Sequence, residues 1–205
     1  MKKKFKLTKE TKVTLEGVTL FRIECTESFK DIKKGDKGGW IEKESNLSGD
    51  AWVYGNAMVY GNALVYGNAM VSGNARVSGY AMVYGNAEVY GNAGVSGNAR
   101  VSGDAEVYGY ALVYGDAMVS GNAGVYGDAD VSGDAWDKTP PLFHGTKHSI
   151  SESKKGFLKI GCMELSFSEW KKKYKEIGKK QGYSENEIEE YGIIIMAIEK
   201  TSKIK

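Results

Sequence analysis

The sequence is poor in the residues that mark disulfide-rich, metal-binding and membrane-spanning proteins. It holds two cysteines, two prolines and two histidines among 205 residues. Two cysteines are too few for a disulfide framework. The longest apolar run, residues 193–198, is far too short to cross a bilayer. The basic N-terminus is not followed by an apolar segment of the kind found in signal peptides, so we expect a cytoplasmic protein without a membrane partner.

Charge is balanced overall but unevenly distributed along the chain. The net charge is +2, made of +3 in residues 1–50, −5 in residues 51–134 and +4 in residues 135–205. Opposite charges on neighbouring parts favour docking or solubility. A DNA-binding protein needs a concentrated basic stripe, so we do not expect a nucleic-acid partner.

The acidic middle of the chain is a hexapeptide repeat without insertions. Fourteen copies of Ala-x-Val-(Tyr/Ser)-Gly-(Asn/Asp/Tyr) run from Ala51 to Asp134. Alternation places Ala and Val on one face, and the variable residue and the Tyr or Ser on the other. Gly and the Asn that follows it tolerate the positive φ of a sharp corner. The fixed short period predicts a solenoid of short strands, each paired with copies above and below it.

Three six-residue sides make a triangular coil of eighteen residues, which is a parallel β-helix. The segment Val53-Tyr54-Gly55-Asn56-Ala57-Met58 resembles the repeats of left-handed β-helix (hexapeptide-repeat) families. The resemblance implies a left-handed coil, whereas general rules for crossovers would favour a right-handed one. With a degraded repeat at residues 47–50, the sequence predicts a mainly β fold with about five coils, roughly 24 Å long at about 4.8 Å per strand.

The segments on either side predict two smaller parts. Residues 1–45 have strand composition with a tight turn at Glu16-Gly17, and we expect a β cap in which Trp40 covers the first coil. The β-helix is expected over residues 46–136, and the only two prolines, at 140 and 141, mark the exit from it.

Residues 137–205 predict short strands followed by two helices. The strands are expected at 144–151 and 156–162, and capping boxes at Ser166 and Ser184 are typical of helix starts. The apolar stripes of the two helices predict a helical hairpin packed on the end of the coil or on another subunit.

The entry to the repeats carries a second resemblance. Lys34 begins a Lys-Gly-x-x-Gly-Gly-Trp-Ile segment, and Asn46 begins Asn-Leu-Ser. This lead, the repeats and the C-terminal extension resemble uncharacterised bacterial and prophage-encoded hexapeptide-repeat proteins. Some of those proteins are labelled as transferases on fold analogy, but a fold does not determine a function.

Residues eighteen apart stack, so the outer faces of the coil can be compared. A column of tyrosines on one face is a candidate ligand or partner surface: Tyr54, Tyr90, Tyr108 and Tyr126. The alternative is that these rings only pack on one another as a sheet ladder. An apolar column on another face is a candidate oligomer or docking face: Leu64, Met82, Met118 and Trp136. Soluble proteins seldom expose such a column, so we expect another subunit or a terminal segment to cover it.

The sequence predicts no catalytic residue, no cofactor and no metal ligand. Hexapeptide-repeat acyltransferases use a histidine base and often an inserted loop, and γ-type carbonic anhydrases bind zinc through three histidines. The repeats here contain no histidine and no inserted loop. His144 and His148 are no established metal pair, and any chemical role for them or for Cys162 stays open.

Three functions therefore compete. The first is a non-enzymatic oligomeric scaffold or binding protein, which the resemblance suggests is a homotrimeric phage or prophage accessory in the host cytoplasm. Its target would be a host protein or a small signalling nucleotide, with a possible anti-defence role. The second is a hexapeptide-repeat acyltransferase. The third is a purely structural or virion-associated protein.

Overall fold

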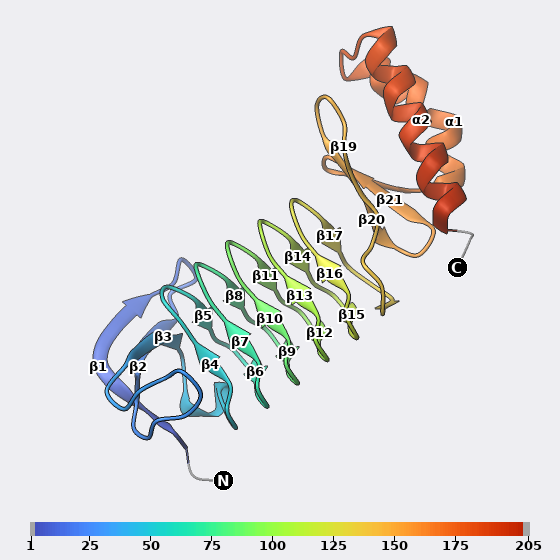
Figure 1. The fold of residues 1–205 in the computed structure, drawn as a ribbon. Coiled ribbons are helices and arrows are strands. Elements are labelled where there is room, and N and C mark those ends of the chain that lie inside the picture. The colour runs from blue at the N-terminus through green and yellow to red at the C-terminus, as the bar shows by residue number, and fades with distance from the viewer. Residues whose placement is uncertain (1–2, 203–205) are drawn as a thin grey trace.

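The computed structural model describes residues 3–202 and shows an elongated molecule. A small β unit at the N-terminal end leads into a five-turn parallel β-solenoid, and a sheet with two helices follows at the far end (Figure 1). The predicted mainly β architecture is confirmed. The hand of the coil stays a prediction from the resemblance.

Each of the fourteen hexapeptides contributes a strand of only two residues, the variable residue and the valine, and a fifteenth strand formed by Ala135 and Trp136 follows them. The strands are β4 (Trp52–Val53), β5 (Met58–Val59), β6 (Leu64–Val65), β7 (Met70–Val71), β8 (Arg76–Val77), β9 (Met82–Val83), β10 (Glu88–Val89), β11 (Gly94–Val95), β12 (Arg100–Val101), β13 (Glu106–Val107), β14 (Leu112–Val113), β15 (Met118–Val119), β16 (Gly124–Val125), β17 (Asp130–Val131) and β18 (Ala135–Trp136). The remaining residues of each repeat form the corner.

The strands build three parallel sheets, one on each side of the coil. We call these sides the first face (β4-β7-β10-β13-β16), the second face (β5-β8-β11-β14-β17) and the third face (β6-β9-β12-β15-β18). Along most of the coil, paired residues are eighteen apart, as in Trp52 with Met70. Backbone amides donate along the axis to the next coil, for example from Trp52 N to the carbonyl oxygen of Ala69 at 3.1 Å. The predicted stacking of repeats is therefore confirmed.

Close approach of the coils explains the glycine at most corners. Gly73 has a φ of +69°, and a Cβ atom there would lie 2.9 Å from the carbonyl oxygen of Gly91 in the next coil. Side-chain amides beside the glycines also join the coils. Asn68 donates to Asn86 at 3.1 Å, and Asn86 donates to Asp104 at 2.9 Å. The corners are thus held by backbone proximity and by ladders of polar side chains.

The N-terminal unit extends the second face and also covers the open end of the coil, because Ile23, Cys25 and Ile32 are buried in the same core as the column. Strands β1 (Phe5–Val13) and β2 (Thr19–Cys25) are antiparallel, and β3 (Lys37–Ile41) pairs with β2 on one side and in parallel with β5 on the other. A short 3₁₀ helix, η1 (Glu44–Asn46), follows. Its buried Asn46 donates to the carbonyl oxygen of Ala63 at 2.8 Å and so connects the lead segment to the coil.

The prediction that Trp40 covers the first coil is wrong. In the pairing of β3 with β5, Trp40 aligns with Met58 on the outside and Ile41 aligns with Val59 on the inside. Ile41 is fully buried in the column, whereas Trp40 is half-buried with the Arg22 guanidinium 5.3 Å from its ring. The strand register therefore assigns the capping role to the smaller residue.

The C-terminal unit has its own sheet and its own core. Strands β19 (Leu142–His144), β20 (Ser149–Lys154), β21 (Phe157–Ile160) and β22 (Met163–Ser166) are antiparallel, and α1 (Phe167–Lys180) and α2 (Glu185–Ser202) form the expected hairpin. Both capping boxes are present: the Ser166 hydroxyl accepts from Glu169 N, and the Ser184 hydroxyl accepts from Glu187 N.

The hairpin packs on this sheet and not directly on the coil. Trp170, Tyr191 and Ile195 from the helices are buried with Ile150 and Leu158 from the sheet. The sheet in turn meets the last coil, where Ser132 N donates to the carbonyl oxygen of Ser153 at 2.9 Å. Lys159 forms an ion pair with Asp130 at the same junction.

The assignment of Trp136 to the outer side of the third face is also wrong. In the last coil Met118 pairs with Ala135 and Val119 pairs with Trp136, so the register has slipped by one residue. Asp134 has a φ of +64° in this last corner, and its carbonyl oxygen accepts from Met118 N as an alanine carbonyl does in the earlier coils. Without the slip, the acidic Asp137 would occupy an inward valine position. A one-residue slip reverses the sides of a strand, so Trp136 points inward, is 2% exposed and closes the core column.

Candidate functional site

Three of the four predicted surface tyrosines form a continuous ring stack on the first face. The ring centroids of Tyr90 and Tyr108 are 4.9 Å apart with an interplanar angle of 1°, and those of Tyr108 and Tyr126 are 5.6 Å apart at 19°. Tyr54 is separate, because Ser72 occupies the coil between it and Tyr90. Its ring instead lies edge-on to Trp52 at 6.5 Å.

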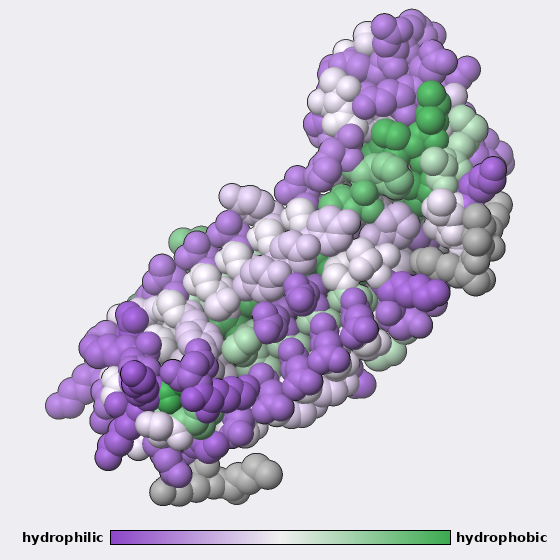
Figure 2. All heavy atoms as spheres, in the orientation of Figure 1, coloured by the Kyte–Doolittle hydropathy of each residue, from purple (hydrophilic) through white to green (hydrophobic). Residues whose placement is uncertain are grey.

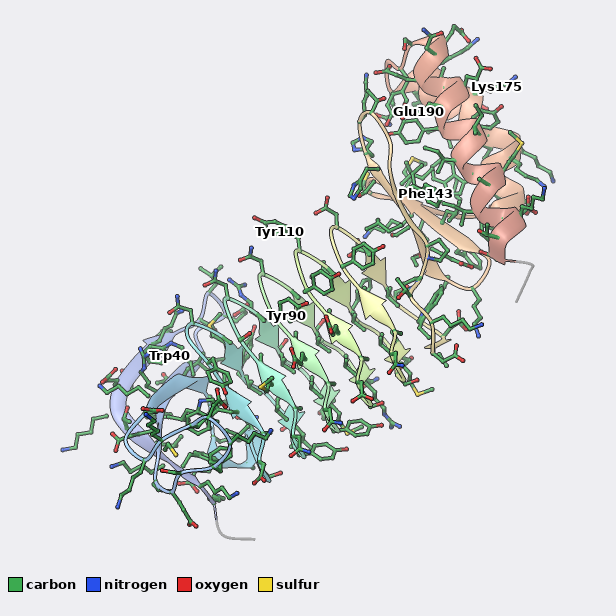
Figure 3. The ribbon with its side chains drawn as sticks, viewed as in Figure 1. Trp40, Tyr90, Tyr110, Phe143, Lys175 and Glu190 are labelled. Atoms are coloured by element: carbon green, nitrogen blue, oxygen red, sulfur yellow. The ribbon has the colours of Figure 1, made fainter. Side chains whose placement is uncertain are left out.

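The stack limits what this surface can offer to a ligand. A ring face that packs on the next ring is not available for stacking with a second molecule. What remains are the ring edges, the hydroxyl groups and the two ends of the column. Figure 3 shows Tyr90 on the outside of the coil, about midway along it.

Carboxylates accompany the tyrosines on the first face. The Tyr90 hydroxyl donates to the Glu106 carboxylate at 2.8 Å. Burial, together with that hydrogen bond and the negative charge of Glu106, raises the pKa of Tyr90 to about 12, so the phenol stays protonated at neutral pH. An open hollow lies near the end of the column between Glu106, Tyr108 and Tyr126. Hydroxyl groups and negative charge suit a polar or cationic partner better than an apolar one.

The third face retains three of its four predicted residues. Leu64 and Met118 are 39% and 41% exposed, and Met82 is half-buried between them. Arg100 interrupts the column between Met82 and Met118. Within residues 3–202 the protein's own terminal segments therefore leave this apolar column open to solvent.

The two histidines and Cys162 all lie in the C-terminal unit. His144 ends β19, and its imidazole is close to the Gly127 corner of the coil. His148 and Cys162 are both exposed and line one cavity. In the part of the chain that the structure describes, no group of three or more His, Cys, Asp or Glu side chains could hold a metal ion. None of the helices within residues 3–202 has both the length and the apolar character to cross a bilayer.

The cavity is the feature that the sequence did not predict. It has a volume of about 240 Å³ and lies between the hairpin of α1 and α2 and the strands β21 and β22. Figure 2 shows apolar residues gathered over this C-terminal unit, while mixed and polar side chains cover most of the coil. The residues that line the cavity are His148, Ile160, Gly161, Cys162, Met163, Trp170, Tyr174, Ile177, Gly178, Gln181, Tyr183, Ile188, Tyr191 and Ile195.

Hydrogen bonds fix several of the polar atoms around this cavity. The Trp170 indole donates to the carbonyl oxygen of Leu158 at 2.8 Å. The Tyr191 hydroxyl accepts from Lys147 N at 3.0 Å and donates to the carbonyl oxygen of His148 at 3.0 Å. Burial, with the adjacent Tyr191, raises the pKa of Tyr183 to about 12, so its hydroxyl stays a neutral donor.

Comparison with known proteins supports the architecture and is confined to the repeats. A family model described as the YdcK beta solenoid repeat matches residues 51–67, 63–79, 69–85 and 111–127. No curated protein matches the chain. The match and the fold together support a β-solenoid repeat protein. The resemblance to phage and prophage hexapeptide-repeat proteins stays a prediction.

Proposed function

We propose that this protein is a non-enzymatic, homo-oligomeric β-solenoid scaffold that binds a partner on its coil. The observation that carries the proposal is the uncovered apolar column of the third face, formed by Leu64, Met82 and Met118. Fully burying a leucine or methionine side chain contributes about 1.5–3 kcal/mol, so a second copy seated on this column would gain part of that value at each of the three coils that carry these residues.

The placement of the terminal units favours another copy as the occupant. The N-terminal strands extend the second face, and the C-terminal sheet meets the coil at β17, which also belongs to the second face. Both attachments leave the third face free. A parallel copy related by a rotation axis would bring each repeat beside the same repeat of its neighbour. Because many left-handed β-helix proteins assemble as trimers, we favour an assembly of three copies.

Native mass spectrometry of the purified protein tests the assembly. We expect an oligomer for the natural protein, and dissociation when Met118→Glu places a charge on the third face. Leu112→Glu is the matched control, because Leu112 is 44% exposed but lies on the second face. A monomeric natural protein, or equal dissociation by both variants, would overturn the proposed interface.

Within this proposal the partner is a host protein or a small signalling nucleotide, bound in the cytoplasm of the cell that a phage or prophage occupies. The hydroxyl edges of Tyr90, Tyr108 and Tyr126 are the binding surface that we favour. The Glu106 carboxylate beside them suits a host protein with a basic patch better than the phosphates of a nucleotide. Extra mass on the native oligomer would report a bound small molecule.

Tyrosine-to-serine variants test this surface without disturbing the coil, since serine already occupies the same position in other repeats. Tyr90→Ser with Tyr108→Ser should abolish binding and leave the oligomer intact. A nucleotide panel and a host-lysate pull-down that both come back empty would remove the partner part of the proposal, whatever the oligomeric state.

A further inference from the structure

We infer that the cavity in the C-terminal unit is a binding site for a small, neutral aromatic molecule of two fused rings. The inference is independent of the oligomer interface, because the cavity lies between the hairpin and its own sheet. The argument depends on the rigidity of the walls, on their chemistry and on the volume they enclose.

The walls are held apart by contacts that leave little freedom for collapse. Two glycines allow the helices to touch: a Cβ atom at Gly178 would lie 2.7 Å from Ile188, and one at Gly192 would lie 2.6 Å from Tyr174. The hairpin therefore cannot tighten further at these two levels. On the sheet side, a Cβ atom at Gly145 would lie 2.7 Å from the Tyr191 ring, so that ring is wedged against the turn between β19 and β20.

The chemistry of the walls suits a neutral aromatic body. None of the lining residues is Asp, Glu, Lys or Arg, so a charged ligand would lose its hydration without gaining a partner of opposite charge. Aromatic walls come from Trp170, Tyr174 and Tyr183, and aliphatic walls come from isoleucines of both helices. Aromatic rings pack favourably in offset or edge-to-face arrangements, which a flat ligand between them can adopt.

Few of the polar groups around the cavity are free to bind a ligand. The Tyr191 hydroxyl and the Trp170 indole are already bonded to the backbone. The Tyr183 hydroxyl is hydrogen-bonded to Tyr191, and the exposed His148, Cys162 and Gln181 stand where the cavity meets solvent. This arrangement orients a mostly apolar ligand through one or two hydrogen bonds.

The volume sets the size of the ligand. Apolar protein cavities of about 150 Å³ bind benzene, which has six non-hydrogen atoms. The cavity here has a volume of about 240 Å³. It exceeds the benzene-binding cavity by about the same factor by which a fused two-ring molecule of nine or ten non-hydrogen atoms exceeds benzene. Indole is a suitable probe of this class, since it is neutral and carries a single donor.

The chain contains its own reporter for occupancy. Cys162 lines the cavity and is exposed, whereas Cys25 is buried at 1% exposure in the N-terminal unit. Iodoacetamide should therefore modify Cys162 first in the folded, full-length protein, and intact-mass spectrometry counts the modification. Indole at about ten times its Kd should slow that reaction roughly tenfold, in proportion to the fraction of empty protein, and should raise the thermal midpoint.

Two methionine variants complete the test. Met163→Trp fills the cavity from β22 and should abolish both the protection of Cys162 and the rise in thermal midpoint. Met196→Trp makes the same change at a position that is 50% exposed on α2 and does not line the cavity, so it should leave both effects intact. Indole that neither slows alkylation nor raises the midpoint of the natural protein would overturn the inference. So would equal protection in folded Met163→Trp.

Discussion

The corner glycines lead to a prediction that separates backbone strain from contact between coils. Three glycines have positive φ but different surroundings. A Cβ atom would meet nothing within 4 Å at Gly17, a backbone oxygen at 3.6 Å at Gly55, and backbone oxygen and nitrogen at 2.9 and 3.0 Å at Gly73. Substitution by alanine therefore adds conformational strain of a similar kind at all three positions, but adds a steric clash only at Gly73.

The magnitudes follow from these distances. Placing an L-residue in the left-handed region costs about 1–2 kcal/mol, and the less flexible unfolded chain offsets about 0.4–1 kcal/mol of that cost. We therefore expect Gly17→Ala and Gly55→Ala to lower the free energy of unfolding by about 1 kcal/mol each. At Gly73 the clash adds the cost of overpacking, about 1–3 kcal/mol. The Gly91 carbonyl oxygen cannot easily move away, because it already accepts a hydrogen bond from Asn74 N at 2.7 Å.

Urea unfolding followed by circular dichroism measures the three values. Gly55→Ala is the important comparison, since it lies in the same repeat array as Gly73 and shares its sign of φ. The expected order is a small and similar loss for Gly17→Ala and Gly55→Ala, and a loss of about 2–4 kcal/mol for Gly73→Ala. Equal losses at Gly55 and Gly73 would refute the view that contact between coils requires glycine.

Two further predictions concern the end of the coil and the helix caps. Trp136→Ala should lower the free energy of unfolding by about 3–5 kcal/mol, and Trp40→Ala by clearly less, since only Trp136 fills the core column; comparable losses in urea unfolding would contradict the register slip. Hydrogen bonds from the Ser166 hydroxyl and backbone amide hold the pKa of Glu169 below its ordinary value of 4.5, so this stabilisation is fully present above that value and is lost as pH falls through the lowered pKa. Carboxyl titration by NMR should show that pKa returning toward 4.5 in Ser166→Ala, and a Glu169 that already titrates at 4.5 in the natural protein would contradict it.

The coil could be predicted residue by residue because its structure is dictated locally. Every repeat carries its own inward residues and its own corner glycine, so one hexapeptide predicts all the others. The prediction failed where the repeat was extended past its end, at Trp136. There the cost of placing Asp137 in an apolar column outweighs the continuity of the register. The prediction for Trp40 failed for a related reason. The pairing of β3 with β5 decides which residue of β3 points inward.

The cavity and the packing of the hairpin were beyond the sequence for another reason. Helix starts and apolar stripes are local, and Ser166, Ser184 and Gly182 marked them correctly. The surface on which a stripe packs is not local, because Ile150 and Ile195 meet only after the sheet and the hairpin have docked. A cavity between such surfaces depends on small mismatches of shape, which no single segment carries.

The stacking of residues eighteen apart makes the coil a molecular ruler. Inserting eighteen residues of repeat would move the C-terminal unit outward by one strand spacing, about 4.8 Å, and return it to the same side of the coil. Inserting six would instead carry it around to the next face by a third of a turn. The number of repeats thus sets both the distance of the C-terminal unit along the coil axis and the face of the coil on which it lies. Either can change without altering a residue at the two ends.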